Sequence, residues 1–296
     1  MMPNNCEVCQ SDKHIKLVFR NNGLAVVKCK SCGLHFVKEN FDLTKLSELY
    51  KENMYDTYWK YESGFYEKHW QEMESHEEDI INDLNRESLN INKFCGKGKL
   101  LDMGCFKGHF CKIMNDRGWD VTGVDISKDA VEYGKNKFGL NLHCGELSEL
   151  NFPKNSFDVI TLWGVIEHFN EPRAAIKQIY LFLKKNGLLV IKTQSQNSFL
   201  TILALLLYKI SFGKVKSHLD FFYSREHLFR FSPKNLRVIL ENEGFKQKEI
   251  TYDSAYIIKF ALKSAKFYIK FPVKLLDIVS RLLIKQDKMT IYALKK

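Results

Sequence analysis

From Lys99 onward, apolar runs alternate with helix-prone segments. The apolar runs are typical of buried strands, and the intervening segments of helices that pack on them. Strands are predicted at "KLLDMGC", "DVTGVDIS", "NLHCGE", "FDVITLWGV" and "GLLVIKTQ". Ser127, just before the segment "KDAVEYGKNKFG", is expected to cap a helix. The alternation therefore predicts an α/β fold around a mostly parallel sheet.

Three zones of different composition divide the chain. Residues 1–38 hold paired cysteines among short β-prone runs, and we expect a small zinc ribbon there. Residues 39–95 contain no proline and are rich in aromatic residues, which predicts a helical lid or linker, or a helical hairpin with its own aromatic core. Residues 96–296 form the expected α/β domain, with an insertion at about 195–231 and a basic amphipathic segment at about 255–285.

The positive charge is concentrated in one part of the chain. Lys and Arg total 45 against 35 Asp and Glu, a formal net charge of +10. Residues 255–296 contribute ten of these cations and only two acids, so the remainder is close to neutral. A nucleic-acid partner normally requires a broad basic face, so this distribution argues against such a partner.

The longest apolar run, Phe199–Leu207, is too short to span a bilayer, and no signal segment is visible, so a cytoplasmic location is expected. This run opens the longer stretch "FLTILALLLYKISFGKVK", which has a basic flank. Two interpretations of this stretch stay open. Together with the basic amphipathic segment it could form a peripheral contact with an anionic membrane. Alternatively, it is an internal lid beside a solvated basic helix. The sequence leaves the oligomeric state undetermined.

Four cysteines near the amino terminus have the spacing of a metal site. Each pair follows C-x2-C, and nineteen residues separate the pairs, whose members are Cys6, Cys9, Cys29 and Cys32. Four thiolates close the tetrahedral shell of zinc and leave no open position, so a structural zinc is predicted. Unrelated thiols and a redox pair are the alternatives.

The stretch "LLDMGCFKGHF" predicts a strand, a tight turn and a helix. Small residues in such a turn let a ligand approach the backbone, and the helix amino terminus supplies amide donors. Asp102 precedes Gly104 by two positions, and Gly108 follows three residues after that glycine. A carboxylate there repels a pyrophosphate but can engage an ammonium group. This favours S-adenosylmethionine over a dinucleotide.

Two further acids follow later strands in order. Asp125 comes about twenty residues after the turn, where it can accept hydrogen bonds from ribose hydroxyls. Glu146 follows the third strand and is expected near the adenine amine. Ordinary acids at helix starts are the alternative for both.

The segments "LLDMGCFKGHF", "VTGVDIS", "FDVITLWGVIEHFNEP", "LFLKKNGLLVIKTQS" and "REHLFRFSPKNLRVILENEGF" resemble class I S-adenosylmethionine-dependent methyltransferases. The resemblance is strongest to the branch of ubiquinone-type O-methyltransferases and bacterial methyltransferases with an amino-terminal zinc-binding segment. It implies a Rossmann-like seven-stranded sheet with a reversed last strand. The segment "KMTIYALKK" would supply this strand. The cofactor-binding residues that it implies are Asp102, Gly104, Cys105, Gly108, Asp125, Ile126, Glu146, Leu147 and Trp163.

Phe106 departs from the family pattern, in which the middle position of the turn usually holds Gly, Ala, Ser or Thr. A ring there either packs away from the cofactor or degrades the site. The intact outer glycines and flanking acids favour the first outcome.

Candidate catalytic residues lie beyond the fourth strand. Glu167 and His168 follow it directly, and His227 lies in the insertion beside Arg225 and Arg230. Histidine can accept a proton from an acceptor near neutral pH, whereas loop ordering and helix capping are the alternatives. The two arginines could pair with a phosphate or carboxylate.

The sequence thus predicts an S-adenosylmethionine-dependent methyltransferase for a small-molecule acceptor. Methylation at oxygen or carbon is expected, with a sugar, nucleotide sugar or lipid-linked precursor as the acceptor. The alternatives are an RNA methyltransferase or a non-catalytic binding or scaffold protein.

Overall fold

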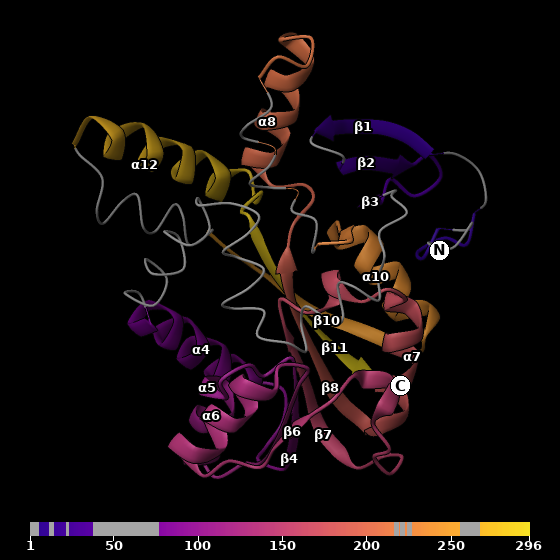
Figure 1. Cartoon of the computed structure of the whole chain (residues 1–296), viewed down its shortest axis with the longest axis vertical. Helices are drawn as coiled ribbons and strands as arrows, with labels where there is room; N and C mark the ends of the chain where they lie inside the picture. The colour runs from indigo at the N-terminus through magenta and orange to yellow at the C-terminus, as the bar shows by residue number, and fades with distance from the viewer. Residues whose placement is uncertain are drawn as a thin grey trace. The chain divides into compact units, whose positions relative to one another are not determined.

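The computed structural model describes residues 6–11, 15–21, 24–37, 77–215, 219, 223, 227–254 and 267–296 (Figure 1). The chain divides into two compact units, each discontinuous in sequence. One comprises Met1–Phe41, Gly164–Ile176 and Ile191–Ala293, and is called here the ribbon unit. The other comprises Asp42–Trp163, Lys177–Val190 and Leu294–Lys296, and is called here the turn unit. The domain boundaries expected from the sequence stay predictions.

A seven-stranded sheet confirms the predicted α/β fold. Its strands, in spatial order, are β10 (Phe245–Asp253), β11 (Lys288–Lys295), β8 (Leu183–Gln194), β7 (Phe157–Trp163), β4 (Lys99–Met103), β5 (Asp120–Asp125) and β6 (Leu142–Cys144). Strand β4 pairs in parallel with β5 and β7, and β5 pairs in parallel with β6. The arrow of β11 points opposite to that of β8 (Figure 1). The last strand is therefore the reversed one that the resemblance implied.

The helices that the structure describes are α4 (Glu77–Ile91), α5 (His109–Asp116), α6 (Lys128–Phe138), α7 (Pro172–Phe182), α8 (Phe199–Ile210), α10 (Pro233–Asn242) and α12 (Phe267–Leu282). Serine side chains cap the starts of α6, α8 and α10. Ser127 accepts a hydrogen bond from the amide of Ala130, which confirms its predicted capping role. Ser232 forms a capping box with Asn235 at the start of α10. Short 3-10 turns follow β6 and β7, at η1 (Leu147–Glu149) and η2 (Ile166–His168).

A second sheet combines the amino-terminal segment with the predicted insertion. Its order is β1 (Ile15–Asn21), β2 (Leu24–Cys29), β3 (His35–Val37) and β9 (Phe229–Arg230). Strand β9 pairs antiparallel with β3. Phe19 and Val26 share a buried core with Ala204 of α8. The ribbon segment is thus completed by residues about two hundred positions later, which no local pattern in the sequence indicated.

Candidate functional site

The turn after β4 places two glycines in the left-handed region. Gly104 has φ +70° and Gly108 has φ +78°, where a side chain is strained. A Cβ on Gly108 would also approach Leu140 Cδ1 to 3.0 Å. The backbone therefore requires the spacing that the sequence shows, and α5 begins immediately afterwards at His109. Within the turn, the amides of Gly104 and Cys105 donate to the Val124 carbonyl, and the Gly108 amide donates to the Cys105 carbonyl.

Phe106 also adopts a left-handed backbone, with φ +49°. A bulky residue rarely does so, and the strain accounts for the small residues that the family prefers here. The Phe106 amide donates to Asp125 Oδ2 over 2.7 Å, which ties the turn to the end of β5. The ring is half-buried, and Lys107 Nζ lies 5.3 Å from its centroid. The expectation that the ring avoids the cofactor stays a prediction.

Asp125 organises both the turn and the start of α6. Besides the Phe106 amide, it accepts a hydrogen bond from the Ser127 amide, at 2.9 Å to Oδ1. Burial raises the pKa of Asp125, although these backbone bonds oppose the shift. Each carboxylate oxygen has capacity for a second donor, so ribose hydroxyls could still bind.

Asp102 is buried beneath the turn and accepts hydrogen bonds from within the protein. Thr161 Oγ1 donates to Asp102 Oδ1 at 2.6 Å, and Cys111 Sγ lies 3.6 Å from Oδ2. Burial raises the pKa of Asp102 to about 7, so the carboxyl is partly protonated near neutral pH. Sequence reasoning missed Thr161 and Cys111 as partners of Asp102. The signal that could have revealed Thr161 is its hydroxyl within the otherwise apolar run "VITLW".

Glu146 and Leu147 lie where β6 ends and η1 begins. The Glu146 amide donates to Glu149 Oε2 at 2.9 Å, within a capping box between these two residues. Leu147 is buried. The proposed contacts of both residues with adenine stay predictions, and the structure shows that Glu146 also serves as a helix cap.

Trp163 ends β7 and packs edge-on against Phe110 of α5, with the ring centroids 4.8 Å apart. Its indole N–H is buried and lacks a hydrogen-bond acceptor within the part of the chain that the structure describes. Such a donor is available to a bound molecule. Cys105 is buried in the turn, and Ile126 is half-exposed just after β5. The turn unit therefore contains all nine predicted cofactor residues.

The predicted catalytic residues form a cluster in the ribbon unit. One ligand atom from each of Glu167, His168 and His227 lies within 4.8 Å of the others. The two imidazole centroids are 4.8 Å apart. Glu167 is buried, and its Oε2 has no hydrogen-bond partner among the described residues. Burial, followed by the charges of His168 and Arg230, lowers the pKa of His227 well below its usual value, so this imidazole is neutral near pH 7.

Arg230 is buried beside this cluster, and its guanidinium donates to Gln194 Oε1. It also lies over the ring of Tyr223, 5.2 Å from the centroid. The Tyr223 hydroxyl meets His35 Nδ1 at 2.9 Å. Burial lowers the pKa of His35 to about 3, and the imidazole is therefore neutral. Sequence reasoning missed His35 and Gln194. Arg225 lies outside the described residues.

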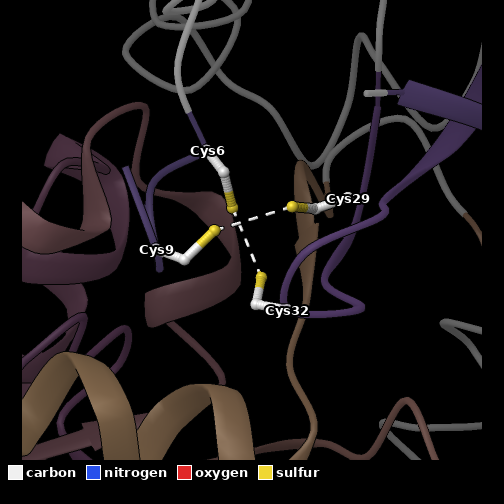
Figure 2. Close-up of side chains that lie close together, drawn as sticks. All are labelled: Cys6, Cys9, Cys29 and Cys32. Atoms are coloured by element: carbon white, nitrogen blue, oxygen red, sulfur yellow. Dashed lines mark hydrogen bonds between the residues drawn. The ribbon is translucent and has the colours of Figure 1, made fainter. Parts of the chain in front are cut away.

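The four amino-terminal cysteines gather at one point (Figure 2). Cys6 Sγ lies 3.5 Å from Cys32 Sγ, and Cys9 Sγ lies 3.6 Å from Cys29 Sγ. All four sulfur atoms fall within 4.8 Å of one another. Zinc–sulfur bonds of about 2.3 Å in a tetrahedron separate the sulfurs by about 3.8 Å, so the arrangement fits a zinc ion.

Two amide side chains fasten the second cysteine pair to the rest of the ribbon unit. Gln196 Nε2 donates to the Gly33 carbonyl, and Asn235 Nδ2 donates to the Cys32 carbonyl, each at 2.9 Å. Gln196 Oε1 also accepts from the His35 amide at 3.0 Å. The cysteine loop thus shares hydrogen bonds with the segments on either side of β9.

Comparisons with known proteins show the family to which the chain belongs. The family model "Methyltransferase domain" matches residues 69–249, more than half of the chain. A ubiquinone biosynthesis O-methyltransferase of Coxiella burnetii is 32% identical over 107 residues, 34% of this chain and 46% of that protein. The mitochondrial one of Schizosaccharomyces pombe is 34% identical over 160 residues, 51% of this chain and 54% of that protein. The chain therefore spans about half the length of these curated relatives.

Solved structures show the same fold. An S-adenosylmethionine-dependent methyltransferase from Archaeoglobus fulgidus has a TM-score of 0.51 at 22% identity, and the match covers 74% of this chain and 94% of that one. Magnesium protoporphyrin IX methyltransferase from Synechocystis, solved with S-adenosylhomocysteine, has a TM-score of 0.54 at 15% identity, covering 86% and 100%. At these identities, the likeness shows the fold alone. Together with the family match, it establishes that the chain belongs to the methyltransferase-domain family, with the class I S-adenosylmethionine-dependent fold.

Proposed function

We propose that this protein transfers a methyl group from S-adenosylmethionine to a small molecule. The observation that carries the proposal is the turn after β4, where the Phe106 amide meets Asp125 Oδ2 at the ends of adjacent parallel strands. Ligands of open α/β sheets bind at this carboxyl edge of the strands. Asp125 and Ile126 would hold the ribose, and Glu146 and Leu147 the adenine. The methionyl end would lie at Asp102, Gly104, Cys105 and Gly108, with Trp163 beside it.

Glu167, His168 and His227 are proposed to assist deprotonation of the acceptor. Methyl transfer from a sulfonium is a displacement that depends on positioning, and an oxygen nucleophile also needs a base. The low pKa of His227 leaves its imidazole neutral and able to accept a proton. The same three donors could instead bind a divalent cation, which would activate an acceptor oxygen by coordination.

Similarity to ubiquinone O-methyltransferases favours an oxygen acceptor. A sugar, nucleotide sugar or lipid-linked precursor is the acceptor class that we propose. The buried guanidinium of Arg230 would suit an acidic group on such a molecule. A cytoplasmic location stays a prediction. The described residues include no helix long and apolar enough to cross a membrane.

A structural zinc ion at Cys6, Cys9, Cys29 and Cys32 is part of the same proposal. The short sulfur–sulfur distances support it, and four protein ligands leave no place for a substrate. The ion would therefore stabilise the ribbon unit without taking part in methyl transfer.

Calorimetric titration with S-adenosylmethionine tests the proposed function. We expect Asp125→Asn to weaken binding by about tenfold or more, because one acceptor for the ribose hydroxyls is lost. Asp129→Asn, on the exposed first turn of α6, is the matched control and should bind like the wild type. Absence of heat from the wild type at millimolar ligand would support a non-catalytic scaffold. Copurifying RNA that is released at high salt would support an RNA methyltransferase.

A further inference from the structure

Helix α12 turns large apolar side chains to solvent. Phe271, Leu275, Ile278 and Leu282 are exposed, Phe271 by 67% and Leu282 by 78%. Their spacing of four, three and four residues places them on one face of the helix. A helix that covers a protein core has its apolar face inward, so packing against the described residues of the ribbon unit does not account for this one.

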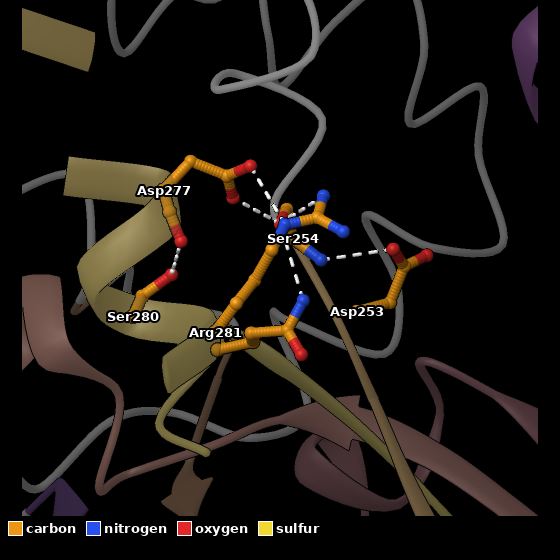
Figure 3. A network of polar contacts seen from close by, with 6 residues as sticks. Asp253, Ser254, Asp277, Ser280 and Arg281 are labelled. Carbon is orange, nitrogen blue, oxygen red and sulfur yellow. Dashed lines mark hydrogen bonds and ion pairs between the residues drawn. The ribbon is translucent and has the colours of Figure 1, made fainter. Parts of the chain in front are cut away.

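Polar contacts on the opposite side fix this orientation (Figure 3). Asp277 is buried and accepts hydrogen bonds from the Ser254 hydroxyl and, at 2.8 Å, from Arg281 Nε. Ser280 donates to the Asp277 carbonyl at 2.8 Å. The side chain of Gln286 also reaches the Ser254 hydroxyl, at 3.3 Å. Ser280 and Arg281 lie on the same helix as Asp277, so the bonds that a rotation of α12 would break are those of Asp277 and Arg281 with Ser254. These bonds to Ser254 keep the apolar face outward.

Helix α8 also exposes large apolar side chains. Ile202, Leu206, Leu207 and Ile210 are exposed along it, and Phe212 just after it is exposed by 95%. Helices α8 and α12 contact each other, as Figure 1 shows for the salmon and yellow helices. The Phe199 amide at the start of α8 donates to the Lys285 carbonyl, just after α12, at 2.7 Å. The exposed apolar residues of both helices, with Phe212, are called here the α8–α12 surface.

The charges that the two helices and their flanking residues carry are almost all positive. Segments 199–215 and 267–285 contain a single acid, Asp277, which is buried and paired with Arg281. Four exposed lysines lie within or beside the two helices, namely Lys209, Lys214, Lys274 and Lys285. Apolar residues bordered by lysines are suited to enter the boundary of an anionic bilayer while the ammonium groups meet lipid phosphates.

We propose that the α8–α12 surface docks the protein on an anionic lipid bilayer. The apolar side chains enter the acyl boundary, and the lysines remain at the headgroups. A second copy of the chain fits less well, because a two-fold interface would bring the same lysine-bordered patch against itself. Docking of this kind would bring the protein to acceptors that are held at a membrane.

Co-sedimentation of the full chain with vesicles tests this proposal without any methyl transfer, so its outcome is independent of the proposed function. The wild type should bind phosphatidylcholine vesicles that contain phosphatidylglycerol, and should release at high salt. Phe212→Asp combined with Phe271→Asp and Ile278→Asp should lower the bound fraction roughly tenfold or more, because three apolar insertions are lost. Lys214→Ser combined with Lys274→Ser should weaken binding and reduce its dependence on salt.

Exposed leucines elsewhere provide the matched control. Leu89→Asp on α4 combined with Leu181→Asp on α7 should leave vesicle binding unchanged. The thermal unfolding temperature of each variant verifies that it folds, as the exposure of every substituted residue leads us to expect. Failure of the wild type to bind, or equal binding by the triple variant, would overturn the proposal. It would also be overturned if the wild type forms dimers without lipid and the triple variant does not.

Discussion

The turn after β4 and the cluster of Glu167, His168 and His227 are assembled in different ways. In the turn, Phe106 reaches Asp125 across 19 positions, because one strand–turn–helix unit brings two neighbouring parallel strands together. The cluster depends on His227, which lies just before β9, and β9 pairs with β3. Beside it, His35 reaches Tyr223 across 188 positions. The first arrangement is thus specified by local sequence, and the second by tertiary packing.

Loss of zinc from the ribbon unit, which also contains the cluster, is expected to have the largest effect on one region and little effect on the other. Cys32→Ser removes one thiolate, so we expect zinc content to fall from one ion per chain to near zero. Structural zinc supplies much of the folding free energy of small zinc domains, and the loss should cost about 3 kcal/mol or more. Unfolding followed by calorimetry, together with metal analysis, measures both effects. The affinity of the turn for S-adenosylmethionine should change by less than about threefold.

Cys144→Ser is the matched control, because this exposed thiol lies outside the cysteine cluster. It should keep both zinc and stability. If Cys32→Ser lowers the affinity for S-adenosylmethionine by clearly more than about threefold, the two regions form one cooperative unit. That result would contradict the distinction drawn between them.

The sequence predicted the turn well because each of its requirements is local. Left-handed φ angles at Gly104 and Gly108 need glycine, and Asp125 must follow the adjacent strand. The same reasoning did not detect how Asp102 is held, since Thr161 belongs to a different strand. It also did not detect β9, a two-residue strand that carries no periodicity of its own. Short strands and long-range partners are determined by packing, which one sequence does not display.

Removing one imidazole tests whether the packed cluster acts in catalysis. We expect His227→Gln to lower kcat by about 100-fold, because general-base catalysis contributes about 10² to 10⁴. The affinity for S-adenosylmethionine should stay the same. Methyl transfer measured as release of S-adenosylhomocysteine, beside calorimetry, gives the two values. His143→Gln, on exposed β6, is the matched control and should retain full activity.

The low pKa of His227 also sets the direction of a pH effect on stability. The folded chain leaves this imidazole neutral, whereas the unfolded chain protonates it below about pH 6.5. Wild-type stability should therefore decrease as the pH falls below that value, and His227→Gln should show a weaker decrease.

In the activity test, full methyl transfer by His227→Gln would assign the cluster to structure alone. Activity that depends on added divalent cation would assign it to a cation site.

Phe106 gives the smallest expected effect, and it tests how strictly local sequence specifies the turn. Phe106→Gly relieves the strain of φ +49° but adds freedom to the unfolded chain, so the two changes nearly offset each other. The free energy of unfolding should change by less than about 1 kcal/mol. Phe106→Ala keeps a Cβ in the left-handed region and should be less stable than Phe106→Gly by about 1 kcal/mol. Both variants remove the ring. If the ring packs away from the ligand, both should bind S-adenosylmethionine within about threefold of the wild type, whereas a common tenfold gain would place the ring in the cofactor's volume.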